Sequence, residues 1–292
     1  MGAIICYIFI IVDIVRLSYA GELSFNFYKM FDVHSHIIYD IDDGSPDRES
    51  SRSLLRMAAA SGTKCIVATP HVIEMYDHPP WQKILDGVEE LRSIVQDEGL
   101  ALTVLPGAEV MLSLDILTVY DDDLNAFCLN NTNYALLELP RFEVPKYTED
   151  LFYKMQLRGL TPVLAHPECY GSLFQTPERL LEWCQRGVLL QCNGGSLLGR
   201  FGPEVEHNVR YMLYNKLISF VGSDAHRVKG RNTDLSEVRS KLVEFVGQNY
   251  ADAICVHNPE MMLRGEDLAV VVPTDLKNLP EDRKGLWKRL FG

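Results

Sequence analysis

The chain has few of the features that mark disulfide-rich secreted scaffolds or nucleic-acid-binding proteins. Its seven cysteines are an odd number without zinc-finger spacing, which fits a reducing compartment better than a disulfide framework. Basic residues are in the minority, with 28 Lys and Arg against 40 Asp and Glu, and the net charge is −12. Such a balance argues against general affinity for nucleic acids or anionic membranes. We therefore expect a cytoplasmic protein with no nucleic-acid partner.

A long uninterrupted apolar run is also missing. Residues 3–12 are apolar, but Asp13 and Arg16 follow them and no basic residue precedes them. The run is therefore a poor secretory signal and is short for a membrane span. We expect residues 1–29 to be a non-catalytic segment. Three interpretations stay open: a start assigned upstream of a true initiator at Met30, a genuine signal or anchor, and an ordered helix.

Strand-like and helix-like segments alternate beyond Met30, which is typical of a parallel βα architecture. Helices are expected near 45–62, 81–98, 147–158, 176–187, 203–214 and 233–249. In the first of these, Ser45 is the expected N-cap and Pro46 lies in the first turn. No internal repeat, long linker or low-complexity segment divides the 292 residues, so one large core is sufficient.

These elements predict an α/β fold, a single distorted (β/α)7 barrel similar to a TIM barrel, with its reactive residues at the carboxyl ends of the strands. The barrel is expected over residues 30–262, with residues 263–292 as a C-terminal extension. An open doubly wound sheet is the structural alternative.

The most informative stretch is Asp32-Val33-His34-Ser35-His36. On a strand, residues i and i+2 point to the same side, so His34 and His36 would present two imidazoles to one metal ion. The acidic turn 40–44 follows at short range and can supply carboxylates. This arrangement predicts the beginning of a metal site.

Ligand-type residues also follow the other short apolar strands. The carboxyl ends of parallel strands meet at one edge of the sheet, so side chains at those ends lie close together. The residues concerned are His71, Glu109, Glu138, His166, Asp224 and His226. The sequence therefore predicts that six strand ends converge on one metal centre.

Taken in order, these motifs resemble the polymerase-and-histidinol-phosphatase (PHP) metallohydrolases. The segments that carry the resemblance are 31–36, 42–44, 70–71, 107–109, 137–138, 165–168 and 223–226, within a match over about residues 30–262. Within that family the pattern is most similar to the bacterial tyrosine phosphatases of capsule and exopolysaccharide synthesis. The resemblance implies a PHP-type barrel and a metal-dependent protein-tyrosine phosphatase whose substrate is a bacterial tyrosine kinase.

The resemblance also implies a trinuclear metal site. Carried over by position, His34, His36, Glu109 and Asp224 hold one metal, Glu109 bridges to a second held by Glu138 and His166, and Asp43, His71 and His226 hold the third. Mixed imidazole and carboxylate ligation suits manganese, iron or zinc. The large share of oxygen atoms among the ligands favours manganese. Such ions lower the pKa of a bound water and supply hydroxide for attack on phosphorus, so Asp224 and His226 would also be catalytic residues.

A cysteine nucleophile is not supported by the spacing of the chain. Cysteine-dependent tyrosine phosphatases commonly use Cys-x5-Arg, whereas seven residues separate Cys192 from Arg200. Cys192 is therefore interpreted as a strand residue, and residues 193–195 as part of the pocket rim.

Phosphate binding favours a planar guanidinium, which makes paired bonds to two phosphate oxygens. Arg231 matches the family's arginine downstream of the Asp-x-His motif and is the predicted anion clamp. A second arginine is often found in the family's His-Pro-Glu-Arg-Tyr sequence, but Cys169 occupies that position here. Either Arg200 or Arg227 compensates for it, or the substrate range differs.

Two other functions stay open. The same site is compatible with a small phosphate monoester such as histidinol phosphate, for which a deep enclosed pocket with extra carboxylates for the ammonium group is expected. A metal-stabilised binding module without catalysis would instead have a phosphate pocket blocked by side chains. A wide pocket that admits a peptide-borne tyrosyl phosphate favours the protein phosphatase. The sequence makes no prediction of oligomeric state.

Overall fold

A computed structural model describes residues 30–73, 78–141 and 144–280. The predicted N-terminal segment 1–29 and the last part of the predicted extension, 281–292, lie outside the described residues. None of the helices within the described ranges combines the length and apolar character that a membrane crossing needs.

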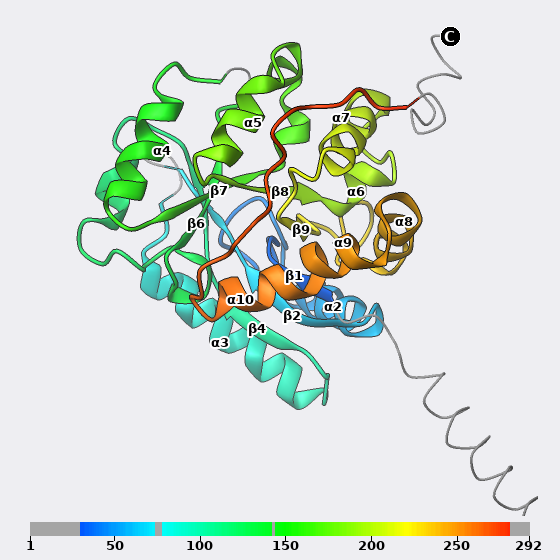
Figure 1. The fold of residues 1–292 in the computed structure, drawn as a ribbon. Coiled ribbons are helices and arrows are strands. Elements are labelled where there is room, and N and C mark those ends of the chain that lie inside the picture. The colour runs from blue at the N-terminus through cyan, green and yellow to red at the C-terminus, as the bar shows by residue number, and fades with distance from the viewer. Residues whose placement is uncertain (1–29, 74–77, 142–143, 281–292) are drawn as a thin grey trace, which may run out of the picture.

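The described strands pair only in parallel and lie at the centre of the molecule (Figure 1). They are β1 (Met30–Asp32), β2 (Thr63–Ala68), β3 (His71–Val72), β4 (Thr103–Pro106), β5 (Glu109–Met111), β6 (Tyr134–Glu138), β7 (Thr161–Ala165), β8 (Leu189–Asn193) and β9 (Phe220–Gly222). One sheet has the order β1-β2-β4 and the other the order β3-β5-β6-β7-β8-β9. The fold is therefore a curled parallel arrangement. The predicted barrel is seen in part, as two sheets instead of one continuous ring.

The chain passes from the first sheet to the second at two places, between β2 and β3 and between β4 and β5. Pro70 separates β2 from β3 and lacks the amide that would continue the ladder. Gly107 lies between β4 and β5, where a Cβ atom would come within 2.9 Å of Val67 Cγ1 and 3.0 Å of Leu129 Cδ2. A single parallel bridge between Ser35 and Ala225 brings the chain after β1 beside the chain after β9.

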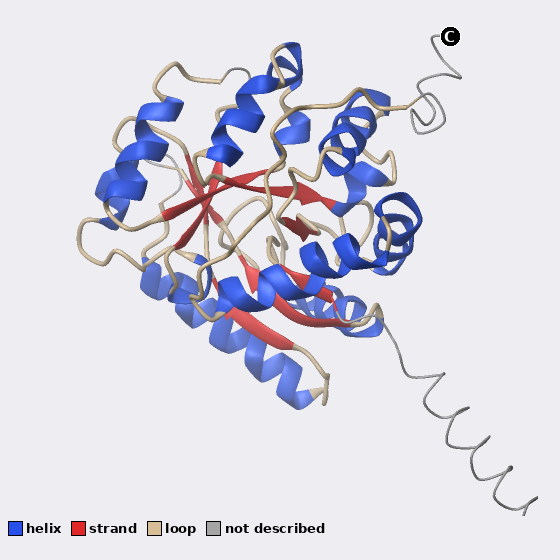
Figure 2. Ribbon diagram, viewed as in Figure 1, coloured by secondary structure: helices blue, strands red, loops and turns tan. Residues whose placement is uncertain are grey.

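Helices surround the strands, as Figure 2 shows. They are α2 (Arg48–Ala60), α3 (Trp81–Asp97), α4 (Thr148–Leu157), α5 (Glu178–Gln185), α6 (Gly194–Leu197), α7 (Pro203–Tyr214), α8 (Ser236–Val246), α9 (Gln248–Asp252) and α10 (Asn258–Leu263). The prediction of Ser45 as the first N-cap was wrong. Asp47 caps α2 by accepting from Ser50 N, while Ser45 is buried and accepts a hydrogen bond from Ser51.

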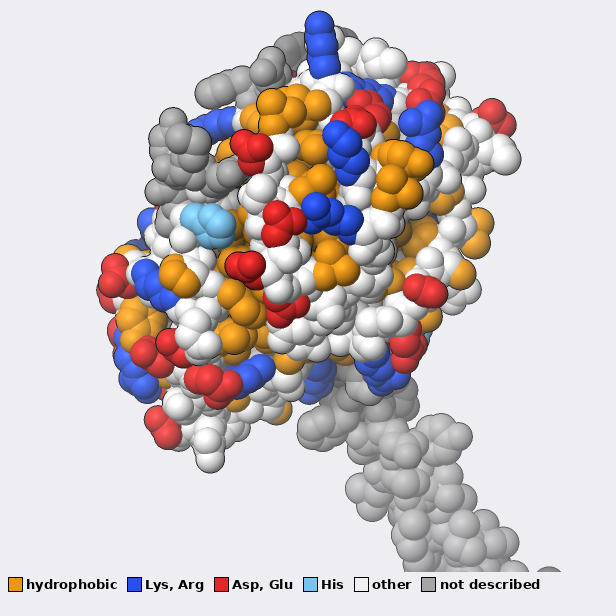
Figure 3. Space-filling model, turned by 90° about the vertical axis from the view of Figure 1, so that its left-hand side faces the viewer, with side chains coloured by type: hydrophobic (Ala, Val, Ile, Leu, Met, Phe, Trp, Pro, Cys, Tyr) orange, Lys and Arg blue, Asp and Glu red, His pale blue; other side chains and the backbone are white. Residues whose placement is uncertain are grey.

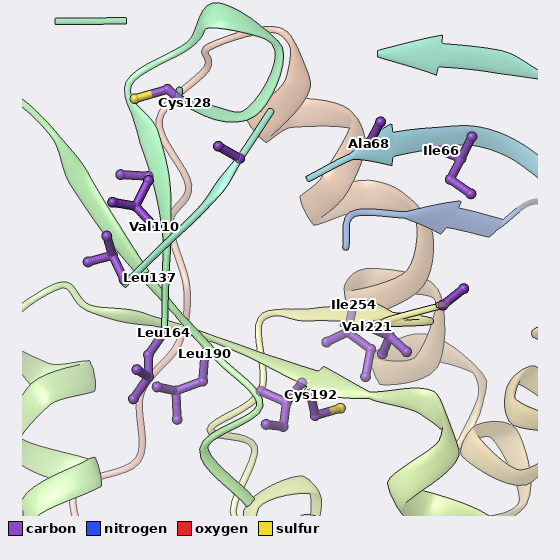
Figure 4. Close-up of a cluster of buried hydrophobic side chains, with 14 of the residues drawn as sticks. Ile66, Ala68, Val110, Cys128, Leu137, Leu164, Leu190, Cys192, Val221 and Ile254 are labelled. Carbon is purple, nitrogen blue, oxygen red and sulfur yellow. The ribbon is translucent and has the colours of Figure 1, made fainter. Parts of the chain in front are cut away.

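The hydrophobic core has two parts, because successive strand residues point to opposite sides. Leu137, Leu164 and Leu190 belong to a large cluster that includes residues from the surrounding helices, and Figure 4 shows these side chains from neighbouring strands together. Their neighbours Leu136 and Val163 belong to a second, smaller cluster between the strands. This alternation directs every second strand residue toward the interior where the candidate site lies.

The C-terminal segment 264–280 runs from the end of α10 toward α7, as the red part of Figure 1 shows. Tyr134 Oη donates to Glu266 O at 2.6 Å, and Asn215 exchanges two hydrogen bonds with Lys277. Leu268 packs against the smaller core cluster and Leu279 is buried in the larger one. Residues 264–280 are called the C-terminal strap below.

Charged residues of both signs are mixed on the surface around α4. Figure 3 shows acidic and basic side chains interspersed with hydrophobic ones on this face. The negative net charge of the chain therefore does not produce a single-sign field on this face of the molecule.

Candidate metal centre

The predicted ligands lie together where the parallel strands end. Each has a potential ligand atom within 4 Å of another member of the set, which comprises His34, His36, Asp43, His71, Glu109, Glu138, His166, Asp224 and His226. Most are buried, but His71 and Glu138 are half-buried and Asp43 is exposed at the rim. The chain thus gathers five imidazoles and four carboxylates from distant parts of the sequence into one cluster.

His34 and His36 do not lie on a strand, as the sequence suggested, because β1 ends at Asp32. Backbone hydrogen bonds to the segment after β9 fix them instead. His34 O accepts from Asp224 N at 2.8 Å, and His36 N donates to Ala225 O at 2.9 Å. The two Nε2 atoms nevertheless converge to 3.1 Å, so both imidazoles face one point.

Glu109 is the centre of the cluster. Its Oε2 atom lies 3.3 Å from the Nε2 atoms of both His34 and His36 and 3.1 Å from His71 Nδ1. Its Oε1 atom lies 2.9 Å from His166 Nε2. The two oxygens therefore face different groups of imidazoles, which is the geometry that a carboxylate needs to bridge two cations.

Asp43 and Glu138 extend the cluster in two directions. Asp43 Oδ1 lies 3.5 Å from His71 Nε2 and 3.3 Å from His226 Nε2. Glu138 lies 3.7 Å from His71 and 3.8 Å from His166. The ligand atoms fall into four overlapping groups: His36, Asp43, His71 and His226; His34, His36 and Asp224; His34, Glu109 and His166; and His71, Glu109 and Glu138.

Three inward ligand atoms are suited to cations. Glu109 Oε2, His71 Nδ1 and His226 Nε2 are buried and make no hydrogen bond within the described structure. Buried polar atoms normally have partners, and a metal ion is one that serves both carboxylate oxygens and neutral imidazole nitrogens. The donor set therefore fits divalent metal ions.

The charges in the cluster support the same conclusion. Burial lowers the pKa of His166, but the hydrogen bond and charge of Glu109 outweigh it and raise the pKa to about 10. The pKa of His36 is raised in the same way, against burial, by Asp42 and Glu109. The carboxylates therefore favour protons on these imidazoles, and metal binding would release those protons.

The backbone is strained at two of the candidate ligands. His166 has a φ angle of 34° and Asp224 has a φ angle of 51°, both in the left-handed region that non-glycine residues rarely adopt. Each conformation costs about 1 to 2 kcal/mol, and surrounding packing must maintain it. Strain of this kind is typical of functional sites.

A cavity of about 810 Å³ opens over the candidate ligands. Besides ligand residues, its lining has a cationic part and an apolar part. The cationic part is Arg141 and Arg231, and the apolar and aromatic part comprises Ile73, Met111, Tyr170 and Phe201. Of the two tyrosines that flank ligand segments, Tyr170 lines the cavity, whereas Tyr39 donates to Glu90. The cavity can therefore accept an anionic group joined to an apolar ring.

Sequence comparison agrees with this site. The family model described as "Capsular polysaccharide synthesis, CpsB/CapC" matches residues 30–264. The chain belongs to the CpsB/CapC family. It is 33% identical over 267 residues to the tyrosine-protein phosphatase YwqE of Bacillus subtilis, covering 90% of this chain and 99% of YwqE. It is 28% identical over 239 residues to the tyrosine-protein phosphatase CpsB of Streptococcus pneumoniae, covering 80% of this chain and 98% of CpsB.

Solved structures agree as well. A chain from the crystal structures of YwqE and CpsB, which are described there as unique metal-dependent tyrosine phosphatases, superposes with a TM-score of 0.78. The sequence identity in that comparison is 33%, and the match covers 85% of this chain and 100% of the other. The resemblance expected from the motifs is therefore confirmed at the level of the CpsB/CapC family.

The arginines of this CpsB/CapC chain have distinct places. Arg231 lines the cavity and donates from Nη1 to Asp224 Oδ2 at 2.9 Å. Arg227 instead donates to the backbone carbonyls of Asp43, Gly44 and His226, and so holds the acidic turn. Neither Arg227 nor Arg200 is among the residues that line the cavity, whereas Arg141 is. The two proposed substitutes for an arginine at position 169 are therefore not placed to act as such.

The cysteines of the site are poor nucleophiles. Cys192 lies on β8, is 2% exposed, and burial raises the pKa of its thiol well above the usual range. Cys169 lines the cavity, but desolvation and the neighbouring carboxylates also raise the pKa of its thiol. A thiol with a raised pKa carries little thiolate at neutral pH, so neither cysteine is activated for attack.

Two residues outside the predicted ligand set contact the candidate ligands: Asp42, from the acidic turn that the sequence singled out, and Gln191, which sequence reasoning missed. Asp42 Oδ2 lies 2.7 Å from His36 Nδ1 and accepts from His71 N at 3.0 Å. Gln191 Oε1 lies 2.9 Å from His34 Nδ1. The sequence did contain a signal that Gln191 has a polar partner. On a strand, residues 191 and 193 point to the same side, so two amides share one face of an otherwise apolar strand.

Gly222 leaves the space in which His34 and Gln191 meet. A Cβ atom at this position would lie 2.6 Å from His34 Cβ and 2.9 Å from Gln191 Nε2. We expect Gly222→Ala to cost about 1 to 3 kcal/mol of folding free energy through overpacking and to lower the bound metal content. Thermal unfolding and elemental analysis measure the two effects. Gly99→Ala is the control, because alanine is strained at the φ of 61° that Gly99 adopts but meets no atom within 4 Å there, away from the site.

If Gly222→Ala retains the wild-type metal content while its stability falls, the close approach of Gly222 serves packing alone.

Proposed function

We propose that this protein is a metal-dependent protein-tyrosine phosphatase that hydrolyses phosphotyrosine on a protein substrate. The observation that carries the proposal is a single cavity in which a cluster of imidazoles and carboxylates adjoins arginines and an apolar wall, in a chain of the CpsB/CapC family. Metal ligands, an anion clamp and a ring-binding surface are the three parts that hydrolysis of an aryl phosphate requires.

The proposed cofactor is three divalent metal ions, with manganese favoured by the oxygen share of the ligands and iron or zinc as alternatives. We assign His34, His36, Glu109 and Asp224 to one ion, Glu138 and His166 with bridging Glu109 to the second, and Asp43, His71 and His226 to the third. Supporting this assignment, Glu109 directs its two oxygens to different imidazoles. His36 also lies in the group of Asp43, His71 and His226, so it adjoins two of the proposed ions. When bound, such ions polarise the phosphoryl oxygens and lower the pKa of a water that attacks phosphorus.

The arginines would bind the phosphoryl group from the protein side. Arg231 is held against Asp224, which fixes its guanidinium at the edge of the ligand cluster. Arg141 follows Glu138 on the chain and lines the same cavity. Planar guanidinium groups make paired, charge-assisted hydrogen bonds to phosphate oxygens. We propose Arg231 as the principal clamp and Arg141 as a second contact.

The apolar residues favour a tyrosyl ring over histidinol phosphate. An ammonium group would require a carboxylate that is not used for metal binding. Each carboxylate in the cavity lining, namely Asp43, Glu109, Glu138 and Asp224, is already a candidate ligand. Phe201 and Met111 instead provide surface on which an aromatic ring can pack. The open cavity also disfavours a purely structural binding module.

We propose further that the two sheets belong to one distorted barrel of seven strands. In this reading β2 and β3 count as one broken strand, as do β4 and β5. The backbone bonds from Thr69 N to Ser35 O and from Glu109 N to Pro70 O continue the pairing across the breaks. The Ser35 to Ala225 bridge supports closure between the first and last strands.

The expected physiological substrate is a bacterial tyrosine kinase of capsule or exopolysaccharide synthesis, and the expected location is the cytoplasm. The family description supports a role in this process, and the names of YwqE and CpsB support a phosphotyrosine substrate.

A phosphatase panel tests the proposal. Metal-stripped protein should be inactive, and manganese should restore hydrolysis of a phosphotyrosine peptide, because the carboxylates alone repel phosphate. We expect kcat/KM for the peptide to exceed that for histidinol phosphate by at least about 100-fold, since only the aryl substrate uses the apolar wall. Release of phosphate measures both reactions.

Cys192→Ala is the matched control for the nucleophile. It should keep most of the activity and lose about 1 kcal/mol of stability through the small cavity it leaves. A trapped phosphocysteine, or turnover that is indifferent to chelators, would contradict the proposed mechanism. Preference for histidinol phosphate would contradict the proposed substrate.

A further inference from the structure

Two buried amides lie behind the candidate metal centre on strand β8. Gln191 is 0% exposed and Asn193 is 1% exposed, and both side chains point inward from the same face of the strand. A buried amide has both a donor end and an acceptor end that must find partners. The partners of these two amides are each other and two of the candidate ligands.

The hydrogen bonds form one continuous chain. Asn193 Nδ2 donates to Asp224 Oδ2 at 2.7 Å, and Gln191 Nε2 donates to Asn193 Oδ1 at 3.1 Å. Gln191 Oε1 lies 2.9 Å from His34 Nδ1. The chain therefore connects Asp224 to the far side of the His34 ring, away from the Nε2 atom that faces the cluster.

The direction of this chain follows from chemistry at its carboxylate end. A carboxylate paired with Arg231 only accepts hydrogen bonds, so Asn193 must present its NH2 group to Asp224. Its oxygen then faces Gln191, which must donate from its own NH2 group. The oxygen of Gln191 is left for His34, whose Nδ1 atom must carry the hydrogen.

We propose that Gln191 and Asn193 act as a positioning relay that holds His34 in its Nδ1–H tautomer, with the Nε2 lone pair directed at the metal centre. This inference rests on the metal centre of the proposed function. The opposite tautomer would place a hydrogen on Nε2, where it blocks ligation, and would leave Nδ1 facing an oxygen without a hydrogen between them. Through the two amides, the carboxylate of Asp224 thus fixes the tautomer of His34.

The local packing supports a fixed arrangement. Gly222 lies against both His34 and Gln191, where a Cβ atom would fall within 3 Å of each. Glu168, which is buried, accepts from Asn193 N at 2.8 Å and from Ser196 Oγ at 2.8 Å. These contacts leave the two amides little freedom to rotate or exchange partners.

The test compares Gln191→Met with Asn215→Leu in the full chain. Each replaces a buried amide by an apolar side chain of similar size, but Asn215 bonds to Tyr211 and Lys277 instead of the ligands. We expect Gln191→Met to weaken Zn²⁺ binding by about 10- to 100-fold, as loss of a partner to a metal-bound histidine typically does. Asn215→Leu should bind Zn²⁺ as the wild type does. Competition with a chromophoric chelator measures both affinities.

Nuclear magnetic resonance of histidine-labelled, Zn²⁺-loaded wild-type protein tests the tautomer without any substitution. We expect His34 to show a protonated, hydrogen-bonded Nδ1 and a metal-bound Nε2. Gln191→Glu retains an acceptor for His34, so it should retain the Nδ1–H signal that Gln191→Met loses or broadens.

Two results would overturn the relay alone: a His34 bound to metal through Nδ1, or equal Zn²⁺ affinity in the wild type and Gln191→Met. Wild-type protein that binds no metal would instead contradict the proposed function together with the relay.

Discussion

Glu109→Gln should lose metal and phosphatase activity together. Glu109 is 1% exposed, and its two oxygens face three imidazoles on one side and His166 on the other. A neutral amide offers one weak oxygen ligand and a donor NH2 group that repels cations, so it cannot bridge two ions. We expect kcat/KM to fall by at least about 1,000-fold, or about 4 kcal/mol in the barrier. Elemental analysis should find less bound metal per chain.

The control for this substitution is Glu149→Gln. Glu149 is a carboxylate that is only partly buried, and it accepts from Arg179 and Trp183 outside the site. Its loss should lower thermal stability and leave the metal content unchanged. Full activity with a normal metal content in Glu109→Gln would remove Glu109 from the metal centre.

Arg231→Lys should impair turnover while sparing the metal. Lysine keeps the positive charge beside Asp224 but loses the planar pair of donors that grips two phosphoryl oxygens. We expect kcat/KM to fall by about 100-fold, the usual loss when one positioned donor to a developing anion is removed. Arg158→Lys is the control, because Arg158 is about as exposed as Arg231 and pairs with an aspartate, Asp121, outside the site. Steady-state kinetics on a phosphotyrosine peptide measure the effect.

Cys169→Arg extends this experiment across the cavity. If the cysteine at position 169 only removes a contact with phosphate, the new arginine should hold or raise activity. It should also partly rescue Arg231→Lys. If Arg141 already serves that part of the phosphate, the same change should lower activity. The double variant distinguishes the cases, since residues that share one phosphate are non-additive. Unchanged kinetics in Arg231→Lys would contradict the role given to Arg231.

The sequence was sufficient to predict that the candidate ligands gather at the strand ends. Short apolar strands that lead directly to His or acidic residues need only the parallel βα rule to place those residues together. His71, Glu138 and His166 were identified in this way, although each is a common residue in an unremarkable local context. The order of the motifs along the chain was more specific for this site than any single motif.

Other features depend on contacts that no local pattern encodes. The left-handed backbone of His166 and Asp224 is imposed by tertiary packing against intrinsic preference. The break after β2 displaces His71 onto a separate short strand, which the continuous run of apolar residues did not predict. Arg141 lines the cavity, but it belongs to no motif in the sequence. Arg231 was predicted because it follows the Asp-x-His motif.

The C-terminal strap shows that the folding unit continues beyond the residues that the family model matches. The family match ends at residue 264, and every candidate ligand precedes it. Yet the strap covers the ends of β6, β7 and β8 opposite the ligands, where it helps to enclose a cavity of about 290 Å³ with Tyr134, Leu189 and Leu217. The family model therefore spans the part of the chain that holds the candidate ligands, whereas the base of the same fold is completed by residues beyond that model.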